Sequence, residues 1–307
     1  MSREIKEIKS KDGYALSLRI YEAQGAKAVV KCIHGMEEHQ DRYEPFAEFL
    51  QKNGYTVVTA DLRGHGRNAP LLSHIADKDG HLRLMEDEEC ILSFIRENYP
   101  GLPVVLFGHS MGTIVARAFL QRHSQSYAKV VLSGYPNPQG VAGVGAALTD
   151  VIGLFRGKKG YSSLVDNMVL GGFAKAVPDA ESPLDWLSYN RDNRDRYAED
   201  PLCGVRFTLG SYNTLFHLVS QINRPDLYQE VKADLPILLI SGVDDPCTGG
   251  EQGRKDSVDR LEKAGFTRIT RIDLEHMRHE ILNEEDREQV YGKILDFLNG
   301  EASSQNA

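Results

Sequence analysis

The sequence predicts an α/β fold in which helices cover both faces of a mostly parallel sheet. Short apolar runs rich in β-branched residues alternate along the chain with helical segments, which is typical of strands joined by helical crossovers. These runs are apolar at nearly every position, as expected of strands that are buried on both faces. Two segments at 4–8 and 14–21, separated by a Lys-Asp-Gly turn, predict an antiparallel hairpin at one edge.

The remaining elements of this sheet follow in order. The helix expected at 43–53 has Phe46, Phe49 and Leu50 on one face and ends at Gly54. The strands are expected at 28–33, 55–60, 103–107, 129–133, 236–240 and 268–273, and all but the last are largely apolar runs. The other helices are expected at 82–99, 111–123, 251–264 and 285–298.

The strand–helix alternation is interrupted between residues 137 and 229. No convincing strand occurs there, and helical segments are expected instead at 144–155, 164–176, 191–197 and 206–221. We therefore expect a core formed by 1–136 and 230–307, with 137–229 inserted as a helical cap. Such a cap would cover the carboxyl edge of the sheet, where open α/β folds bind their ligands.

Composition excludes several classes of protein. The chain has 307 residues and a formal net charge of −8, so it lacks the basic surface of a nucleic-acid-binding protein. Its 4 cysteines are scattered with no C-x-x-C pair, which argues against a metal centre or a disulfide framework. We expect no metal and no cofactor. A charged N-terminus without an apolar segment predicts a cytoplasmic protein without a signal peptide.

A G-x-S-x-G motif at 108–112 predicts a nucleophilic serine, Ser110. A buried strand precedes the motif and a helix follows it, which is the context that a nucleophile elbow requires. The tight turn needs small neighbours, and the start of the helix directs backbone N–H groups towards a developing anion. The alternative is a glycine-rich turn without chemistry.

A serine hydroxyl needs a base, and the expected order after this elbow is an acid and then a histidine. Asp244 and Asp245 follow one late strand, and His276 and His279 follow the next. We favour Asp244 as the acid, because Asp245 precedes Pro246 and is restricted to extended backbone. We favour His279 as the base. The other member of each pair is expected to be a solvated loop residue or a hydrogen-bonding neighbour.

Two backbone N–H groups are expected to form an oxyanion hole. One belongs to Met111, directly after the nucleophile. The other is expected in the loop after the third strand, where a His-Gly pair precedes Met36. Three further histidines near these motifs, His34, His65 and His109, are expected to be structural hydrogen-bonding groups.

Taken together, these motifs resemble the monoacylglycerol lipase and lysophospholipase branch of the α/β-hydrolases, the serine aminopeptidase S33 or Hydrolase_4 group. The resemblance implies an α/β-hydrolase fold with Ser110, Asp244 and His279 as a triad and the N–H groups of Met36 and Met111 as oxyanion donors. The matching segments are H-G-M-E-E-H-Q-D-R-Y at 34–43, D-L-R-G-H-G at 61–66, G-H-S-M-G at 108–112, S-G-V-D-D-P-C at 241–247 and H-E-I-L-N-E at 279–284.

The expected function is hydrolysis of a carboxylic ester through an acyl-enzyme. The substrate would be a monoacylglycerol, a lysophospholipid or a similar small acyl ester. A peptidase or amidase of the same fold is the alternative, since Glu181, Asp185 and Asp192 of the cap could hold a free amino terminus. A non-catalytic ligand-binding homologue is a third hypothesis, and the complete set of motifs argues against it.

The segment 141–155 is apolar, rich in small residues, and followed by Arg156, Lys158 and Lys159. One interpretation is a lid helix that lines an acyl tunnel and makes transient contact with a membrane surface. The other is a helix packed on the core whose last turn carries basic residues. Composition does not separate the two.

Overall fold

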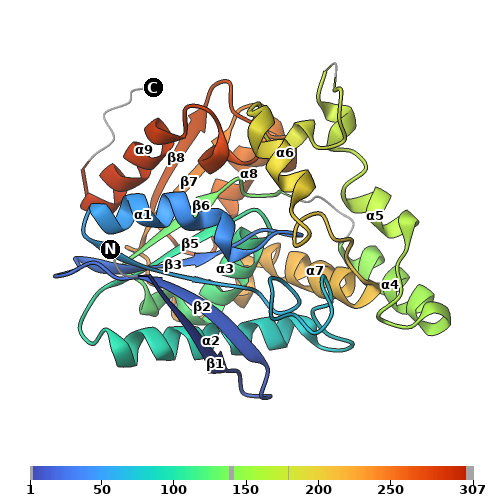
Figure 1. The fold of residues 1–307 in the computed structure, drawn as a ribbon, viewed down its shortest axis with the longest axis horizontal. Helices are drawn as coiled ribbons and strands as arrows, with labels where there is room; N and C mark the ends of the chain where they lie inside the picture. Colours follow the sequence, from blue (N-terminus) through green and yellow to red (C-terminus); the bar gives the residue numbers. More distant parts are fainter. Residues whose placement is uncertain (1–2, 138–141, 179, 302–307) are drawn as a thin grey trace.

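A single sheet of 8 strands forms the centre of the computed structural model, which describes residues 3–137, 142–178 and 180–301 (Figure 1). The strand order is β1-β2-β4-β3-β5-β6-β7-β8. Strand β2 pairs antiparallel with β1 and with β4, and all other pairs are parallel. The strands are β1 (Arg3–Lys9), β2 (Ala15–Tyr21), β3 (Ala28–Ile33), β4 (Tyr55–Ala60), β5 (Val104–His109), β6 (Lys129–Ser133), β7 (Pro236–Gly242) and β8 (Arg268–Leu274). The predicted mostly parallel sheet with an antiparallel edge is confirmed.

Helices cover both faces of this sheet. One face packs against α1 (Glu44–Lys52) and α9 (Arg287–Asn299), and the other packs against α2 (Gly80–Asn98), α3 (Met111–His123) and α8 (Gly250–Lys263). Because successive strand residues point to opposite faces, Val105 joins the first layer and Leu106 the second. This alternation explains why the central strands are apolar along their whole length.

A charged pair interrupts that apolar pattern. Lys31 on β3 and Glu88 on α2 are both buried and form an ion pair between the sheet and the helix layer. Each charge would be costly to bury alone, so the pair is tolerated because the two neutralise each other.

Between β6 and β7 the described residues contain helices and short turns but no strand. The helices are α4 (Ala142–Arg156), α5 (Ser163–Val169), α6 (Arg191–Glu199) and α7 (Leu209–Ile222), and they gather on one side of the sheet (Figure 1). The predicted domain limits at 136/137 and 229/230 stay predictions. None of the helices in the described ranges combines the length and apolar character needed to span a membrane.

One cap element differs from its prediction. The helix expected over 164–176 ends at Val169, and only a short 3₁₀ turn at Ala174–Ala176 follows. Gly171 and Gly172 stand between the two pieces, and glycine in a helix interior costs about 1 kcal/mol relative to alanine. The apolar periodicity continues through the glycines, but the helix does not.

Candidate active site

Ser110 occupies a strained turn between β5 and α3. Its backbone has φ 51° and ψ −122°, and a positive φ in a non-glycine residue is typical of functional sites. A β-carbon added at Gly112 would collide with the carbonyl oxygens of Ile33 and His34, at the end of β3. The first turn of α3 therefore lies directly against this strand end, which holds the serine at the carboxyl edge of the sheet.

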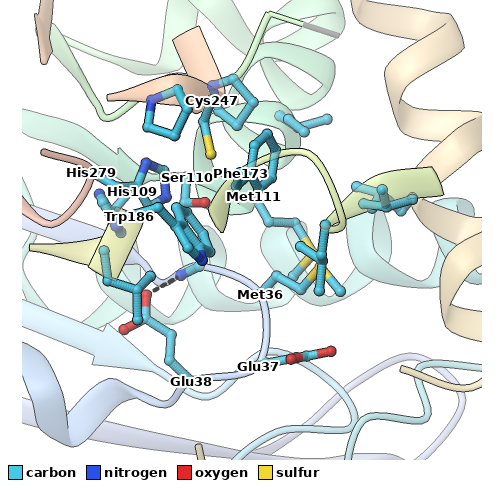
Figure 2. A pocket seen from close by; sticks show the side chains of 18 of the residues that line it. Met36, Glu37, Glu38, His109, Ser110, Met111, Phe173, Trp186, Cys247 and His279 are labelled. Carbon is cyan, nitrogen blue, oxygen red and sulfur yellow. Dashed lines mark hydrogen bonds between the residues drawn. The ribbon is translucent and has the colours of Figure 1, made fainter. Parts of the chain in front are cut away.

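This serine opens into a cavity of about 310 Å³ between the sheet and the cap. His279, Met36 and Met111 also line the cavity, and Figure 2 shows Ser110, His109 and His279 together at one end of it. The walls beyond are mainly apolar and come largely from the cap, including Met168, Phe173, Trp186, Leu215, Phe216 and Val219. An apolar cavity with a few polar groups at one end is typical of a small-molecule site.

Of the two candidate bases, only His279 reaches this cavity. It is 2% exposed, whereas His276 is exposed on the surface. The imidazole of His279 packs between Trp186, at a ring-centroid distance of 5.0 Å, and His109, at 4.8 Å. No hydrogen bond joins Ser110 and His279 among the described contacts, and such bonds are often long until substrate binds. The structure places both side chains at the same end of one cavity.

The prediction that Asp244 is the acid beside His279 is wrong. Asp245, not Asp244, accepts a hydrogen bond from Nδ1 of His279, at 2.9 Å from its Oδ2. The other oxygen of Asp245 accepts from the N–H of Cys247 at 2.8 Å, and the side chain is fully buried. Asp245 does have the extended backbone that Pro246 imposes, with φ −76° and ψ 108°. Its carboxylate is nevertheless buried against His279, so the restriction imposed by the proline does not exclude Asp245.

Asp244 lies on the outside of the same loop. It is exposed, and its Oδ2 accepts a hydrogen bond from the hydroxyl of Tyr189 in the cap at 3.0 Å. The guanidinium of Arg278 lies 3.8 Å from the centre of the Tyr189 ring. Asp244 therefore links the cap, through this hydrogen bond, to the loop that follows β7.

The charge of Asp245 affects the protonation of His279. Burial by itself would lower the pKa of His279, because desolvation disfavours the imidazolium. The charge and hydrogen bond of Asp245 outweigh this effect, and the pKa of His279 is raised above its usual value. The pair therefore stabilises the protonated histidine that forms when a base accepts a proton.

The two predicted oxyanion donors have free N–H groups. Neither Met36 N–H nor Met111 N–H has an acceptor in the part of the chain that the structure describes. A β-carbon added at Gly35 would lie 3.1 Å from the β-carbon of Ser110, so the loop backbone runs directly beside the serine. The carboxylate of Glu38 accepts the Gly35 N–H at 2.5 Å and holds this loop in place.

Sequence reasoning missed a group of buried charges behind the loop. Burial would raise the pKa of Glu38, but Arg42 and nearby groups hold it at about 2. Arg42 also contacts Glu280, the residue after His279. Both glutamates lie inside the motifs at 34–43 and 279–284. The available signal was their place in the sequence, Glu38 beside the expected oxyanion donor Met36 and Glu280 beside the expected base His279.

The three other histidines act as neutral hydrogen-bonding groups, as expected. Burial lowers the pKa of His34 to about 4, of His65 to about 3 and of His109 to about 4. The unprotonated Nε2 of His34 accepts the N–H of Leu62 at 2.9 Å. None of them has a carboxylate partner of the kind that His279 has.

Two clusters among the described residues contain metal-ligand types. One joins His39, Asp200 and Cys203, and the other joins Asp245, Cys247 and His279. A hydrogen bond of 2.9 Å already links the histidine and the aspartate in each cluster. These bonds account for both arrangements without a cation, and the absence of a metal stays a prediction.

The strained serine, the carboxylate-bound histidine after the last strand and the surrounding sheet define an α/β-hydrolase. The chain belongs to the Hydrolase_4 family, described as serine aminopeptidase, S33, which matches residues 24–286. The predicted resemblance to this family is therefore confirmed.

Two relatives and one solved structure illustrate the similarity. The chain is 29% identical over 176 residues to a monoacylglycerol lipase of Mycolicibacterium smegmatis, a match that covers 57% of this chain and only 56% of that protein. It is 27% identical over 250 residues to human monoglyceride lipase, covering 79% and 74%. A thermostable carboxyl esterase from Bacillus coagulans superposes with a TM-score of 0.87 at 24% identity, covering 98% and 99%, and shows the shared fold.

Proposed function

We propose that this protein is a serine hydrolase that cleaves carboxylic esters, with monoacylglycerols, lysophospholipids or similar small acyl esters as substrates. The observation that carries the proposal is the strained Ser110 in the same cavity end as the Asp245-bound His279. The apolar walls beyond Ser110 suit an acyl chain, and the names of the relatives agree with an ester substrate.

In this proposal Nε2 of His279 takes the proton of Ser110 as its oxygen attacks the ester carbonyl. The N–H groups of Met36 and Met111 bind the oxyanion, and Asp245 holds the imidazole in the required tautomer. The alcohol leaves with the proton from His279 and an acyl-serine remains. Water, deprotonated by His279, then attacks the acyl-serine, releasing the carboxylic acid and returning a proton to Ser110.

The cap carboxylates give little support to a peptidase. Asp185 is buried, and its carboxylate accepts the backbone N–H of Glu181 at 2.8 Å, while Asp192 is exposed. None of the three lines the cavity. Two of the glutamates that do line it, Glu38 and Glu280, are already paired with Arg42. A free amino terminus would therefore find none of the partners expected from the sequence.

A substrate profile tests this proposal. Wild-type protein is assayed on p-nitrophenyl esters of increasing chain length and on aminoacyl arylamides, with Ser110→Ala as background. We expect kcat/KM for esters to rise by up to ~4-fold per added methylene until the cavity is full, because each buried methylene contributes about 0.8 kcal/mol. We expect arylamides to be at least ~10²-fold poorer.

Faster cleavage of arylamides would contradict the ester assignment and favour the peptidase. Absence of fluorophosphonate labelling at Ser110 in folded protein would contradict both and favour a non-catalytic binding protein.

No described residue of α4 lines the cavity, so the expected lining of an acyl tunnel by this helix is not found. Its outer face supports the other part of the lid interpretation, the contact with a membrane surface. Its inner face packs on α7, where Gly145 lies against the ring of Phe216. On the outer face Leu154 is 83% exposed and Phe155 is 86% exposed, and the exposed basic residue Lys159 follows the end of the helix. We infer that this face rests transiently on a lipid surface, from which a protein in the predicted cytoplasmic location would reach its substrate.

Sedimentation with lipid vesicles tests this contact. Leu154→Ser combined with Phe155→Ser should weaken binding to phosphatidylcholine vesicles containing phosphatidylglycerol by at least ~10-fold, because each inserted side chain contributes about 1.5–3 kcal/mol. Hydrolysis of a short water-soluble ester should not change. Leu82→Ser, at a 50% exposed leucine on α2, is the matched control. Equal vesicle binding by wild type and the double variant would rule out the contact.

A further inference from the structure

One arginine joins the two loops that form the reactive end of the cavity. Arg42 follows the loop that carries Met36, and its Nη1 donates to Glu38 at 2.7 Å. The same guanidinium donates to both oxygens of Glu280, each at 2.6 Å. All three side chains are largely buried, with exposures of 11% for Arg42 and 4% for each glutamate. A single cation thus pairs with and aligns two buried carboxylates.

Each carboxylate is linked to one of the groups proposed to act on the substrate. Glu38 accepts the N–H of Gly35 at 2.5 Å and the hydroxyl of Tyr43 at 2.8 Å, which fixes the backbone immediately before Met36. Glu280 directly follows His279 in the chain. We call the loop that carries Met36 the oxyanion loop. The distance between this loop and His279 is therefore set by one guanidinium that binds both carboxylates.

The cap contributes a residue to this cluster. Asn193, on α6, accepts from Nη2 of Arg42 at 3.1 Å and donates from Nδ2 to Glu280 at 2.6 Å. It is 3% exposed. The ring of Tyr197, one turn further along α6, lies 4.9 Å from the guanidinium carbon of Arg42. The cap therefore completes both the hydrogen bonding and the packing of the arginine.

We propose that Arg42 is a positioning residue that holds the oxyanion loop and the His279 loop at their working separation, and that Asn193 makes this separation depend on the seated cap. The inference rests on the proposed function and adds a structural link between the cap and the rate of the chemical step. The link needs an arginine, because a lysine ammonium is a point charge that lacks the planar fork able to bind Glu280 through two oxygens and Glu38 at once.

The experiment compares Arg42→Lys and Asn193→Ala with wild type on a p-nitrophenyl ester, with enzyme concentration set by fluorophosphonate titration of Ser110. Each variant should lose ~10-fold or more in kcat per active site with KM changed by less than about 2-fold, because sub-ångström misplacement of reacting groups lowers the rate more than it lowers binding. Asp195→Ala, an exposed position on the same helix, is the matched control and should retain wild-type kcat.

The kcat of the double variant Arg42→Lys/Asn193→Ala is the second measurement. If Arg42 and Asn193 act through one cluster, the double variant should lose little more kcat than the more damaged single variant. A purely structural role would lower the melting temperature and the titratable fraction while leaving kcat per titrated site unchanged. That result for Asn193→Ala overturns the proposal, even if Arg42→Lys fails to fold. Failure of the proposed function is distinguishable, because wild type itself would then show no ester hydrolysis above the Ser110→Ala background.

Discussion

Ser110→Ala and His279→Ala are each expected to lose at least ~10³-fold in kcat for ester hydrolysis, by analogy with removal of triad residues in other serine hydrolases. Alanine at 110 removes the attacking oxygen, and alanine at 279 removes the group that takes its proton. Because nucleophile and base act as a unit, the variant that carries both substitutions should have a kcat no lower than that of the less active single variant. Steady-state kinetics with purified proteins measures all three losses.

The control for the base is the neighbouring surface histidine. His276→Ala should retain kcat within about 2-fold, since that side chain is exposed and does not line the cavity, and surface substitutions of this kind are usually small in effect. If His276→Ala is the inactive variant and His279→Ala is active, the base has been assigned to the wrong residue. Melting temperatures of the variants identify any loss that comes from unfolding.

Asp245→Asn is expected to lower kcat by ~10³–10⁴-fold, while Asp244→Asn stays within about 2-fold of wild type. The amide of an introduced asparagine can donate to Nδ1 of His279 and thereby favour the wrong tautomer, with the proton on Nε2. The two substitutions are well matched, because each replaces an aspartate by an asparagine of nearly the same shape at adjacent positions. Only Asp245 contacts His279. An inactive Asp244→Asn beside an active Asp245→Asn would reverse the assignment.

The pH dependence of the same variants provides an independent check. His279 must be neutral to accept a proton, so kcat/KM should fall as the pH drops through its pKa. Since Asp245 raises that pKa above the usual value of 6.5, the acid limb of wild type should lie above pH 6.5. Asp245→Asn removes the negative charge, and burial then lowers the pKa, so its acid limb should move to lower pH. An unmoved limb would show that this histidine is not the titrating base.

Local sequence determined the fold and the position of the nucleophile. Strands buried on both faces must be apolar along their length, and helices must repeat their apolar residues every three to four positions, so both leave a visible pattern. The elbow is also local, because Gly108, Ser110 and Gly112 lie within one turn, where a β-carbon at Gly108 would collide with the backbone of Gly112 and one at Gly112 with the end of β3. These features depend on neighbours in the chain, which the sequence displays directly.

The tertiary structure alone decided which aspartate meets His279 and how the cap is tied to the site. Asp244 and Asp245 are chemically equivalent neighbours, and their different roles come from the direction in which the loop leaves β7. The contacts among Arg42, Glu280 and Asn193 join residues separated by up to 238 positions. Such pairs form because the sheet and cap bring distant loops together, and no local propensity encodes which loops will meet.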